Sequence, residues 1–407
     1  MIFYYRGAFP LKKRKKQIRR FAYIAVLFPL AVYRSIRKDK ESIPVIALLA
    51  FLGGVIIVGL AASQWRSNQT DNISGEISIE DSVATETVAT VTATPVRTEP
   101  VSITVSFAGD CTFGMDSSFS YEGSFNAMYD SNDPEYFLQN VQSIFAADDV
   151  TVVNFEGTLT DSEDRADKTW AFRGDAEYAK VLSAGSVEAV NLANNHSSDY
   201  GEESLADTKA ALSAEGITYF GFEETAILEV KGIKIGFLGL YTVYTDDSYT
   251  SQLEARIQEL QDEGAAVIIA SFHWGYENSY TPEQDQIELA HAAIDAGADL
   301  VIGHHPHVLQ GIEEYNGHYI AYSLGNFCFG GNYNPADYDC IIVQQTFTVT
   351  GADVDIEPLQ VIPCSVSSSS SYNNYQPTPA EGSEKERIFE KLQAISADLG
   401  DGSSWTP

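Results

Sequence analysis

Short apolar runs alternate with stretches of helical periodicity between residue 101 and about residue 364. Five runs rich in Val, Ile and Ala, each followed by Gly or polar residues, predict buried β-strands over 102–109, 150–157, 187–194, 265–275 and 298–305. Amphipathic patterns between these runs predict helices over 134–147, 203–216 and 282–297. The third pattern has Thr281 and Pro282 as N-cap and first helical position, and Gly297 as its stop. This alternation is typical of an α/β fold.

Two further segments have the pattern of β-hairpins. Residues 226–241 turn at Lys231-Gly232, and residues 311–327 turn at Asn316-Gly317, a strong hairpin signal. Hairpins pair strands antiparallel, whereas strands joined through helices pair parallel. We therefore expect mixed sheets, arranged as two packed sheets with helices outside.

The N-terminal part of the chain differs in charge from the rest. Residues 1–42 contain twelve Lys or Arg against Asp39 and Glu41, a net charge of +10, so residues 43–407 are near −42 in a chain of −32. Between them, residues 43–63 have no charged side chain over 21 positions, enough to cross a bilayer core of about 30 Å as a helix. The positive-inside rule places 1–42 in the cytoplasm and the remainder outside a cell membrane crossed once.

Other readings of this region are a buried soluble helix or a cleaved signal peptide. A soluble helix is rarely apolar on all faces beside such a basic cluster, and the apolar run is long and starts late for a signal peptide. The shorter run 21–33 contains Pro29 and is expected at the membrane interface.

Two polar tracts flank the main domain. Residues 64–100, rich in Ser, Thr, Glu and Pro, cannot bury enough apolar surface to order themselves and are expected to form a disordered stalk. The domain proper is expected over 101–364, followed by a Ser-rich linker at 365–383. Residues 384–407 are expected to be a C-terminal helix and tail, which either pack back or remain loose.

The four cysteines do not follow a metal or redox spacing. None of Cys111, Cys328, Cys340 and Cys364 forms a CxxC pair, which argues against a thiolate zinc site. An extracellular location permits a disulfide, and Cys328 and Cys340 are the nearest pair in sequence.

Polar residues with chemical potential follow the buried strands. Open α/β sheets bind ligands at the carboxyl ends of their strands. The candidates are Asp110, Asn154, Glu156, Asn194, Asn195, His196, Asp199, His273, Glu277, His304, His305 and His307. Taken singly, several have simpler explanations: Asp110 as a turn residue, the Asn pair as Asx turns, and His273 as a core histidine.

Three of the seven histidines occur within residues 304–307, directly after a predicted strand. Neutral imidazole is a common metal ligand, and Pro306 stiffens the backbone that presents His305 and His307. His291 lies inside a helical pattern and His318 follows a hairpin turn, so both are expected to be structural or exposed.

These candidates together could hold one or two divalent cations. The ligands would be Asp110, Glu156, Asn195, His273, His305 and His307. Mixed imidazole, carboxylate and amide donors suit Mn, Zn or Fe rather than Ca or Mg. Two such cations polarise a substrate and stabilise charge in the transition state. His196, beside the ligand amide, is placed to protonate a leaving group.

The order of motifs resembles the CapA-type poly-gamma-glutamate capsule synthesis proteins, which share the calcineurin-like metallophosphoesterase fold. The resemblance covers about 102–364 and rests on GD at 109, NFEG at 154, NLANNH at 191, HWG at 273, GHHPH at 303 and SLGNF at 323. It implies a metallophosphoesterase-like layered sandwich of two mixed sheets flanked by helices, here preceded by one transmembrane helix.

Carried over by motif, the resemblance gives Asp110 as the first-strand ligand, Glu156 as the bridging acid and His273 as the mid-chain ligand. Asn195 with His196 would be ligand and general acid, with Asp199 as a second catalytic residue, and His305 with His307 would be the closing pair. Substrate contacts are assigned to Asn154, Asn194, Trp274, His304 and Asn326. Thr112 stands where the superfamily usually has a histidine, and Glu156 where its phosphatases have Asp.

Three functions remain open. The first is a membrane-anchored extracellular hydrolase or transferase of polyglutamate or related polymer assembly. The second is a non-catalytic partner that anchors or guides capsule synthase subunits. The third is a general surface metallophosphoesterase, and fold alone does not choose among them. No nucleic-acid partner is expected.

Overall fold

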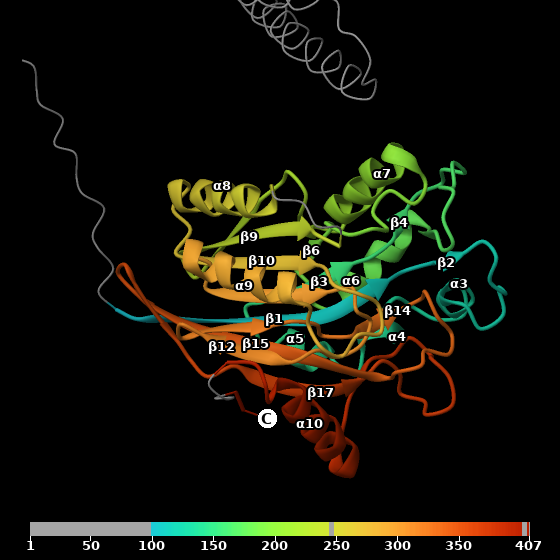
Figure 1. Ribbon diagram of the computed structural model, residues 1–407. Coiled ribbons are helices and arrows are strands. Elements are labelled where there is room, and N and C mark those ends of the chain that lie inside the picture. The colour runs from blue at the N-terminus through green and yellow to red at the C-terminus, as the bar shows by residue number, and fades with distance from the viewer. Residues whose placement is uncertain (1–98, 244–247, 401–404, 407) are drawn as a thin grey trace, which may run out of the picture. The chain divides into compact units, whose positions relative to one another are not determined.

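The computed structural model describes residues 99–243, 248–400 and 405–406 (Figure 1). The predicted basic segment 1–42, the span 43–63 and nearly all of the stalk lie outside this part of the chain. No helix within the described ranges combines the length and apolar character needed to cross a membrane.

Two mixed sheets form the centre of the domain. The first sheet has the order β18-β17-β15-β1-β3-β6-β7, with β14 beside β1 and β16 beside β15. Its strands are β1 Val101–Thr112, β3 Val150–Phe155, β6 Ala189–Asn191, β7 Thr218–Phe220, β14 Asn326–Phe329, β15 Asp339–Thr350, β16 Asp353–Ile356, β17 Gln360–Ser365 and β18 Thr378–Pro379. Strands β1, β3, β6 and β7 run parallel, and β15 pairs antiparallel with β1.

The second sheet has the order β12-β13-β11-β10-β9-β8. Its strands are β8 Ala226–Val230, β9 Ile233–Tyr241, β10 Val267–His273, β11 Leu300–His304, β12 Ile312–Tyr315 and β13 His318–Ala321. The two predicted hairpins are confirmed as the antiparallel pairs β8–β9 and β12–β13. A small third sheet contains β2 Met115–Asp116, β5 Phe172–Gly174 and β4 Thr158–Leu159.

Apolar side chains from both large sheets share one buried cluster, in which Phe107 of β1 and Val152 of β3 join Phe237 of β9 and Ile302 of β11. Helices α8 Tyr249–Asp262 and α9 Gln284–Ala296 cover the outer face of the second sheet (Figure 1). The outer face of the first sheet packs against five helices: α3 Phe125–Tyr129, α4 Glu135–Leu138, α5 Gln142–Phe145, α6 Lys180–Ala184 and α7 Gly201–Ala214. The 3-10 turn η1 Ala176–Ala179 directly precedes α6. The expectation of two packed mixed sheets with helices outside is confirmed.

Two helix predictions need correction. The helix expected over 134–147 is divided into α4 and α5, because the amide of Val141 bonds to the carbonyl of Leu138 in a turn between them. Helix α9 begins at Gln284 after the extended residue Glu283, two residues beyond the predicted proline start. Its left-handed stop at Gly297 is as predicted, with φ at 110°.

The Ser-rich segment 365–383 is not a free linker. Strand β18 pairs with β17, and Tyr375 is 1% exposed. Helix α10 Gly382–Ser396 follows it and buries Ile388 and Leu392 in the cluster between the sheets. The terminal helix therefore packs back onto the domain. Sequence polarity was misleading because the polar residues Ser367 and Asn374 are buried and hydrogen-bonded to each other: the Ser367 hydroxyl donates to Asn374 Oδ1 and accepts from the Asn374 amide.

All four cysteines are buried and free, so Cys328 and Cys340 form no disulfide. Cys340 lies opposite Cys364 on neighbouring strands β15 and β17. Burial raises the pKa of Cys111 and of Cys364 to about 12, which keeps both as thiols at neutral pH.

Candidate metal centre

The strand ends of both sheets meet at one site, as the sequence predicts. Asp110 lies near the end of β1, Glu156 directly after β3, and Asn195 with His196 in the loop after β6. From the second sheet, His273 ends β10 and the 304–307 histidines follow β11. Parallel strands present their carboxyl ends at a common edge, so residues far apart in sequence become neighbours.

Glu156 is fully buried and lies at the centre of this group. Neither of its carboxylate oxygens has a hydrogen-bond partner. The Nε2 atoms of three histidines surround Oε1 at 3.7 Å for His196, 3.8 Å for His273 and 3.8 Å for His307. Burial raises the pKa of Glu156 to about 8. A buried carboxylate without donors is costly, so this position favours a positive charge beside it.

Asp110 is the second buried carboxylate. Asn154 Nδ2 donates to its Oδ1 at 2.8 Å, and the backbone amide of His305 donates to its Oδ2 at 3.3 Å. Burial alone would raise the pKa of Asp110, but the neighbouring imidazoles of His304 and His307, at 3.4 and 3.3 Å, hold it well below its ordinary value. Asp110 is therefore an ionised oxygen donor.

Two of the histidines are uncharged at neutral pH, the form in which imidazole can bind a metal. Burial lowers the pKa of His273 far below its ordinary value and that of His305 to about 4. Nε2 of His273 lies 2.7 Å from Oδ1 of Asn195, and Nδ1 of His305 is buried without a hydrogen-bond partner. Neutral imidazole nitrogens facing an amide oxygen and a carboxylate are a suitable donor set for a metal.

The 304–307 turn holds its histidines in an unusual backbone conformation. His305 has φ at 96° and His307 has φ at 57°, a region that non-glycine residues rarely adopt. Such residues cost of order 1–3 kcal/mol each and persist where the surroundings determine them. Asn326 supplies part of that support, because its Oδ1 lies 2.9 Å from His307 Nδ1 and its Nδ2 donates to the His307 carbonyl at 3.3 Å.

The donor atoms form two overlapping groups that could hold a cation. Glu156, His305 and His307 offer atoms within 4.8 Å of one another, as do Asp110, Glu156 and His273. Glu156 is common to both groups. The unpartnered oxygens of Glu156 and the mixed imidazole and carboxylate chemistry fit a transition metal such as Mn, Zn or Fe.

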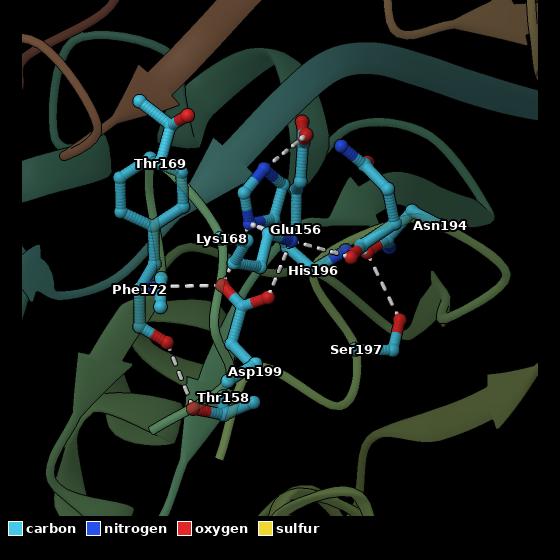
Figure 2. A network of polar contacts seen from close by, with 12 residues as sticks. Glu156, Thr158, Lys168, Thr169, Phe172, Asn194, His196, Ser197 and Asp199 are labelled. Atoms are coloured by element: carbon cyan, nitrogen blue, oxygen red, sulfur yellow. Dashed lines mark hydrogen bonds and ion pairs between the residues drawn. The ribbon is translucent and has the colours of Figure 1, made fainter. Parts of the chain in front are cut away.

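His196 and Asp199 form a buried pair beside Glu156 (Figure 2). Nδ1 of His196 lies 2.6 Å from Oδ2 of Asp199, which directs the opposite nitrogen, Nε2, toward Glu156. Burial lowers the pKa of His196. An imidazole oriented by a carboxylate on one side can pass a proton on the other.

Lys168 is a site residue that the sequence prediction missed. Its Nζ donates to Oδ1 of Asp199 at 2.7 Å and to the carbonyl of Asn195 at 2.8 Å, and lies 3.2 Å from Nδ1 of His196. Asn191 is a second omission: its Nδ2 donates to Oδ1 of Asn154 at 3.1 Å. Asn191 belongs to the quoted NLANNH motif, whereas the polar loop around Lys168 carries no local signal.

A cavity of about 180 Å³ opens onto this group. Of the predicted site residues, His196, His307 and Asn326 line it, together with Glu277. The cavity wall also includes Trp170 and Phe172, whose contribution the sequence pattern did not indicate.

Four of the residues assigned to substrate contact do not line this cavity. Trp274 is 1% exposed in the core outside the second sheet, where its Nε1 donates to the Tyr322 carbonyl. Asn154 is fully buried behind Asp110, and His304 is 2% exposed beside the same carboxylate.

The fourth, Asn194, holds the loop after β6. Its Nδ2 donates to the Phe155 carbonyl, and its Oδ1 accepts from the His196 amide and the Ser197 hydroxyl. Trp274, Asn154 and Asn194 are supporting residues because their polar side-chain atoms are hydrogen-bonded inside the protein, whereas His304 Nδ1 has no hydrogen-bond partner and lies 3.4 Å from Asp110 Oδ1.

The fold and these side chains together define an α/β sandwich with a buried acidic and histidine group suited to a divalent cation. Residues 104–331, more than half of the chain, match the family model of the bacterial capsule synthesis protein PGA_cap. The chain therefore belongs to this family of CapA-type capsule synthesis proteins.

Named relatives agree with this membership. The PGA biosynthesis protein CapA of Bacillus subtilis (strain 168) is 34% identical over 213 residues, 47% of this chain and 56% of that protein. The capsule biosynthesis protein CapA of Bacillus anthracis is 28% identical over 299 residues, 67% of this chain and 69% of that protein. A probable polyglutamine synthesis accessory protein of Mycobacterium tuberculosis is 29% identical over 210 residues, 44% of this chain and 55% of its own. The match thus spans little more than half of two of these relatives.

Solved structures overlap more loosely. A novel phosphatase from Mycoplasma pneumoniae has a TM-score of 0.42 at 13% identity, covering 65% of this chain and 94% of that one. A hypothetical protein from Thermus thermophilus has a TM-score of 0.40 at 16% identity, covering 63% and 100%. Overlaps of this quality support no conclusion about function.

Proposed function

We propose that this protein acts in poly-gamma-glutamate capsule assembly as a metal-dependent hydrolase or transferase at an amide or phosphate bond. The observation that supports the proposal is Glu156, whose two oxygens are buried without partners among three histidine rings. Burial raises the pKa of this carboxyl to about 8, so the metal-free site holds a proton there that a bound cation would replace. Family membership supplies the capsule pathway, and the Bacillus relatives carry that pathway in their names.

The metal would be held by Asp110, Glu156, Asn195, His273, His305 and His307. When bound, it would supply the positive charge that stabilises negative charge developing on the substrate. Asn154 orients the site through its hydrogen bond to Asp110 and its contact with His273 Nδ1 at 3.3 Å. Such supporting contacts fix ligand orientation.

His196 would protonate the leaving group. Its side chain lines the cavity, and Asp199 fixes its ring from behind. Asp199 also accepts from Lys168 Nζ and from the Phe172 amide, at 2.7 and 2.6 Å. With its carboxylate so fully paired, Asp199 serves to orient His196 and to stabilise its protonated form, and the proton itself moves at His196 Nε2.

The N-terminal sequence supports a proposal about location. Residues 43–63 would anchor the chain in the cell membrane, with 1–42 in the cytoplasm and the domain outside, where the polymer and its synthase subunits would be the partners. Bound cations would offset part of the repulsion between this acidic chain and a polyglutamate substrate.

Metal content tests the proposal directly. The full-length chain, expressed with metal supplied and purified in detergent, is analysed by mass spectrometry beside the double variant His305→Ala, His307→Ala. We expect one or two equivalents of Mn, Zn or Fe in the parent chain and loss of that metal in the variant. The matched control is His291→Ala, His318→Ala, which removes two histidines that contact Glu313 and the Asp299 carbonyl away from the site. Absence of metal from the parent chain would refute the catalytic proposal.

Thr112 favours a second candidate, a non-catalytic partner that anchors or guides the synthase. It replaces a histidine expected from the superfamily, and its hydroxyl is buried without a partner. Capsule output at the parental level from the His305→Ala, His307→Ala variant would support this function. Loss of output from a folded variant would exclude it.

A further inference from the structure

A second cavity adjoins the metal centre. It has a volume of about 480 Å³, within the roughly 300–1,000 Å³ usual for small-molecule sites. Trp170, Gly331 and Asn332 line both cavities, so the two share a wall. The residues that line the second cavity contribute no group to the candidate metal centre.

Four aromatic residues line this second cavity: Phe119, Trp170, Tyr333 and Tyr375. Trp170 and Tyr333 are each 48% exposed, while Tyr375 is 1% exposed and closes the pocket from within. Phe119 lies beside Trp170 with ring centroids 5.3 Å apart. Large rings left half-exposed around a hollow offer apolar area that water covers poorly, which marks a binding surface.

The rings are fixed before any ligand arrives. The Tyr375 hydroxyl donates to the Gly123 carbonyl at 2.8 Å. Asn373 clamps the segment before Tyr333, because its Nδ2 donates to the carbonyls of Phe329 and Asn332 at 2.9 and 3.0 Å. Preorganised walls reduce the ordering cost of binding.

The Trp170 side is held as well. The amide of Ala171 donates to Asp116 at 2.7 Å, and Arg165 pairs with the same carboxylate at 2.7 Å. Arg165 also donates to the Thr169 carbonyl at 3.2 Å. The backbone on both sides of Trp170 is thereby fixed.

The charge of the lining selects the ligand. In the part of the chain that the structure describes, neither cavity is lined by Lys or Arg. Glu122 lines the aromatic cavity, and Glu277 and Asp337 line the metal cavity. A polyanion would meet like charge here without a compensating cation in the aromatic pocket. The aromatic pocket is therefore poorly suited to the polyglutamate chain itself.

We infer that the aromatic pocket is a subsite for a neutral glycan. A pyranose ring has an apolar C–H face that stacks on Trp or Tyr, and an edge of hydroxyls that donate hydrogen bonds. Ser120, Glu122 and Asn332 provide oxygen acceptors along the same lining. All three residues are exposed, so a ligand hydroxyl would take the place of water as their hydrogen-bond partner.

The shared wall gives the subsite a role. A glycan seated against Trp170 would extend toward the cavity that contains His196 and His307. The substrate class of the metal site would then be a glycan-linked molecule. This last step rests on the proposed function, whereas glycan binding in the pocket does not.

The test is calorimetric titration of the full-length chain in detergent with a neutral β-1,4-linked N-acetylglucosamine oligomer. We expect saturable binding that Trp170→Ala and Tyr333→Ala each weaken by about tenfold, from loss of ring stacking. The matched control is Tyr276→Ala, which removes a ring that is 64% exposed and lines neither cavity, and it should bind as the parent does. Thermal midpoints verify that each variant is folded.

Further titrations distinguish failure of this inference from failure of the proposed function. The variant His305→Ala, His307→Ala should retain glycan binding even though it loses metal. Absence of binding to the parent chain, or parental binding by both ring variants, would overturn the subsite. Tighter binding of a poly-gamma-glutamate oligomer, or of the cationic deacetylated glycan, would overturn the assignment to a neutral ligand.

Discussion

Glu156 and His307 lie 3.8 Å apart and share protons that a cation has to displace. Burial raises the pKa of Glu156 to about 8. Burial alone would lower the pKa of His307, but the charges of Glu156 and Asp110 outweigh it and raise the pKa to about 10. The metal-free site therefore compensates its carboxylates with protons, and metal binding exchanges those protons for the ion.

This exchange predicts a pH dependence. Glu156, with a pKa of about 8, loses its proton in part between pH 6 and pH 8. His307, with a pKa of about 10, stays protonated over that interval and has to release its proton when metal binds, so metal affinity should increase as the pH rises. Titration calorimetry of the metal-free chain with Mn²⁺ in buffers of different ionisation enthalpy should detect proton release at pH 7. The His305→Ala, His307→Ala variant is the control and should lose both the binding and the proton release. Affinity that falls with rising pH would contradict the assigned ligands.

Asn154 offers a test of the supporting contacts. Replacing it with Ala removes the 2.8 Å hydrogen bond to Asp110 and the contact with His273, so both ligands lose an orienting partner. We expect metal affinity to fall about 10–100-fold, the usual range for such changes. Competition with a chromophoric chelator measures it. Asn140→Ala, which removes a hydrogen bond to Thr378 remote from the site, should leave affinity unchanged.

That the candidate ligands lie close together was predictable because each lies at or just after the end of a buried strand, and strand ends meet by the geometry of the fold. Substrate contacts were less predictable. Trp274 and Asn194 adjoin ligands in sequence, yet both face inward, since neighbouring residues point to opposite sides of a strand or into a loop. Lys168 reaches Asp199 across 31 positions of sequence, a contact that exists only after folding.

At the scale of elements, the buried strands and both hairpins were predictable from local pattern. Apolar runs fixed the strands, and Lys231-Gly232 and Asn316-Gly317 fixed the turns, since Lys231 and Asn316 adopt positive φ values of 52° there. Helix α8 was not predicted, although Leu253, Ile257 and Leu260 repeat at helical spacing and are buried. Ser248, a residue type typical of helix starts, occupies its N-cap position, so the helix could have been predicted from the sequence.

Helix α10 lies beyond the matched family segment and should still stabilise the domain. Leu392 is fully buried in the cluster shared by both sheets. Leu392→Ala should lower the free energy of unfolding by about 2–5 kcal/mol through lost burial and a residual cavity. Urea unfolding of the full-length chain measures this value. Glu390→Ala, on the exposed face of the same helix, should change it by no more than about 0.5 kcal/mol. Equal stability of both variants would mean that α10 contributes little to the core.

The whole molecule has a steep charge asymmetry. Residues 1–42 carry +10, whereas residues 43–407 are near −42. Such an acidic surface favours solubility and opposes close approach to anionic lipid or anionic polymer except where cations or neutral ligands intervene. A cation bound at the candidate metal centre would relieve that opposition locally, whereas the aromatic pocket, lined by Glu122, would favour a neutral ligand.

The N-terminal region could attach to the membrane in two ways, as an integral anchor or by electrostatic adhesion, because the basic segment alone would also bind an anionic membrane surface. Washing experiments distinguish the two. A peripheral protein held by charge is released at high salt through screening, whereas a helix of 21 uncharged residues remains. We expect the full-length chain to stay with membranes through high-salt and alkaline washes, and a variant lacking 43–63 to be released by salt.

In intact protoplasts, external protease should cut within 64–100 and free the folded domain, while residues 1–42 stay protected. Release of the parent chain by salt would indicate peripheral attachment in place of an anchor. A mature protein whose mass shows removal of 43–63 would indicate a cleaved leader.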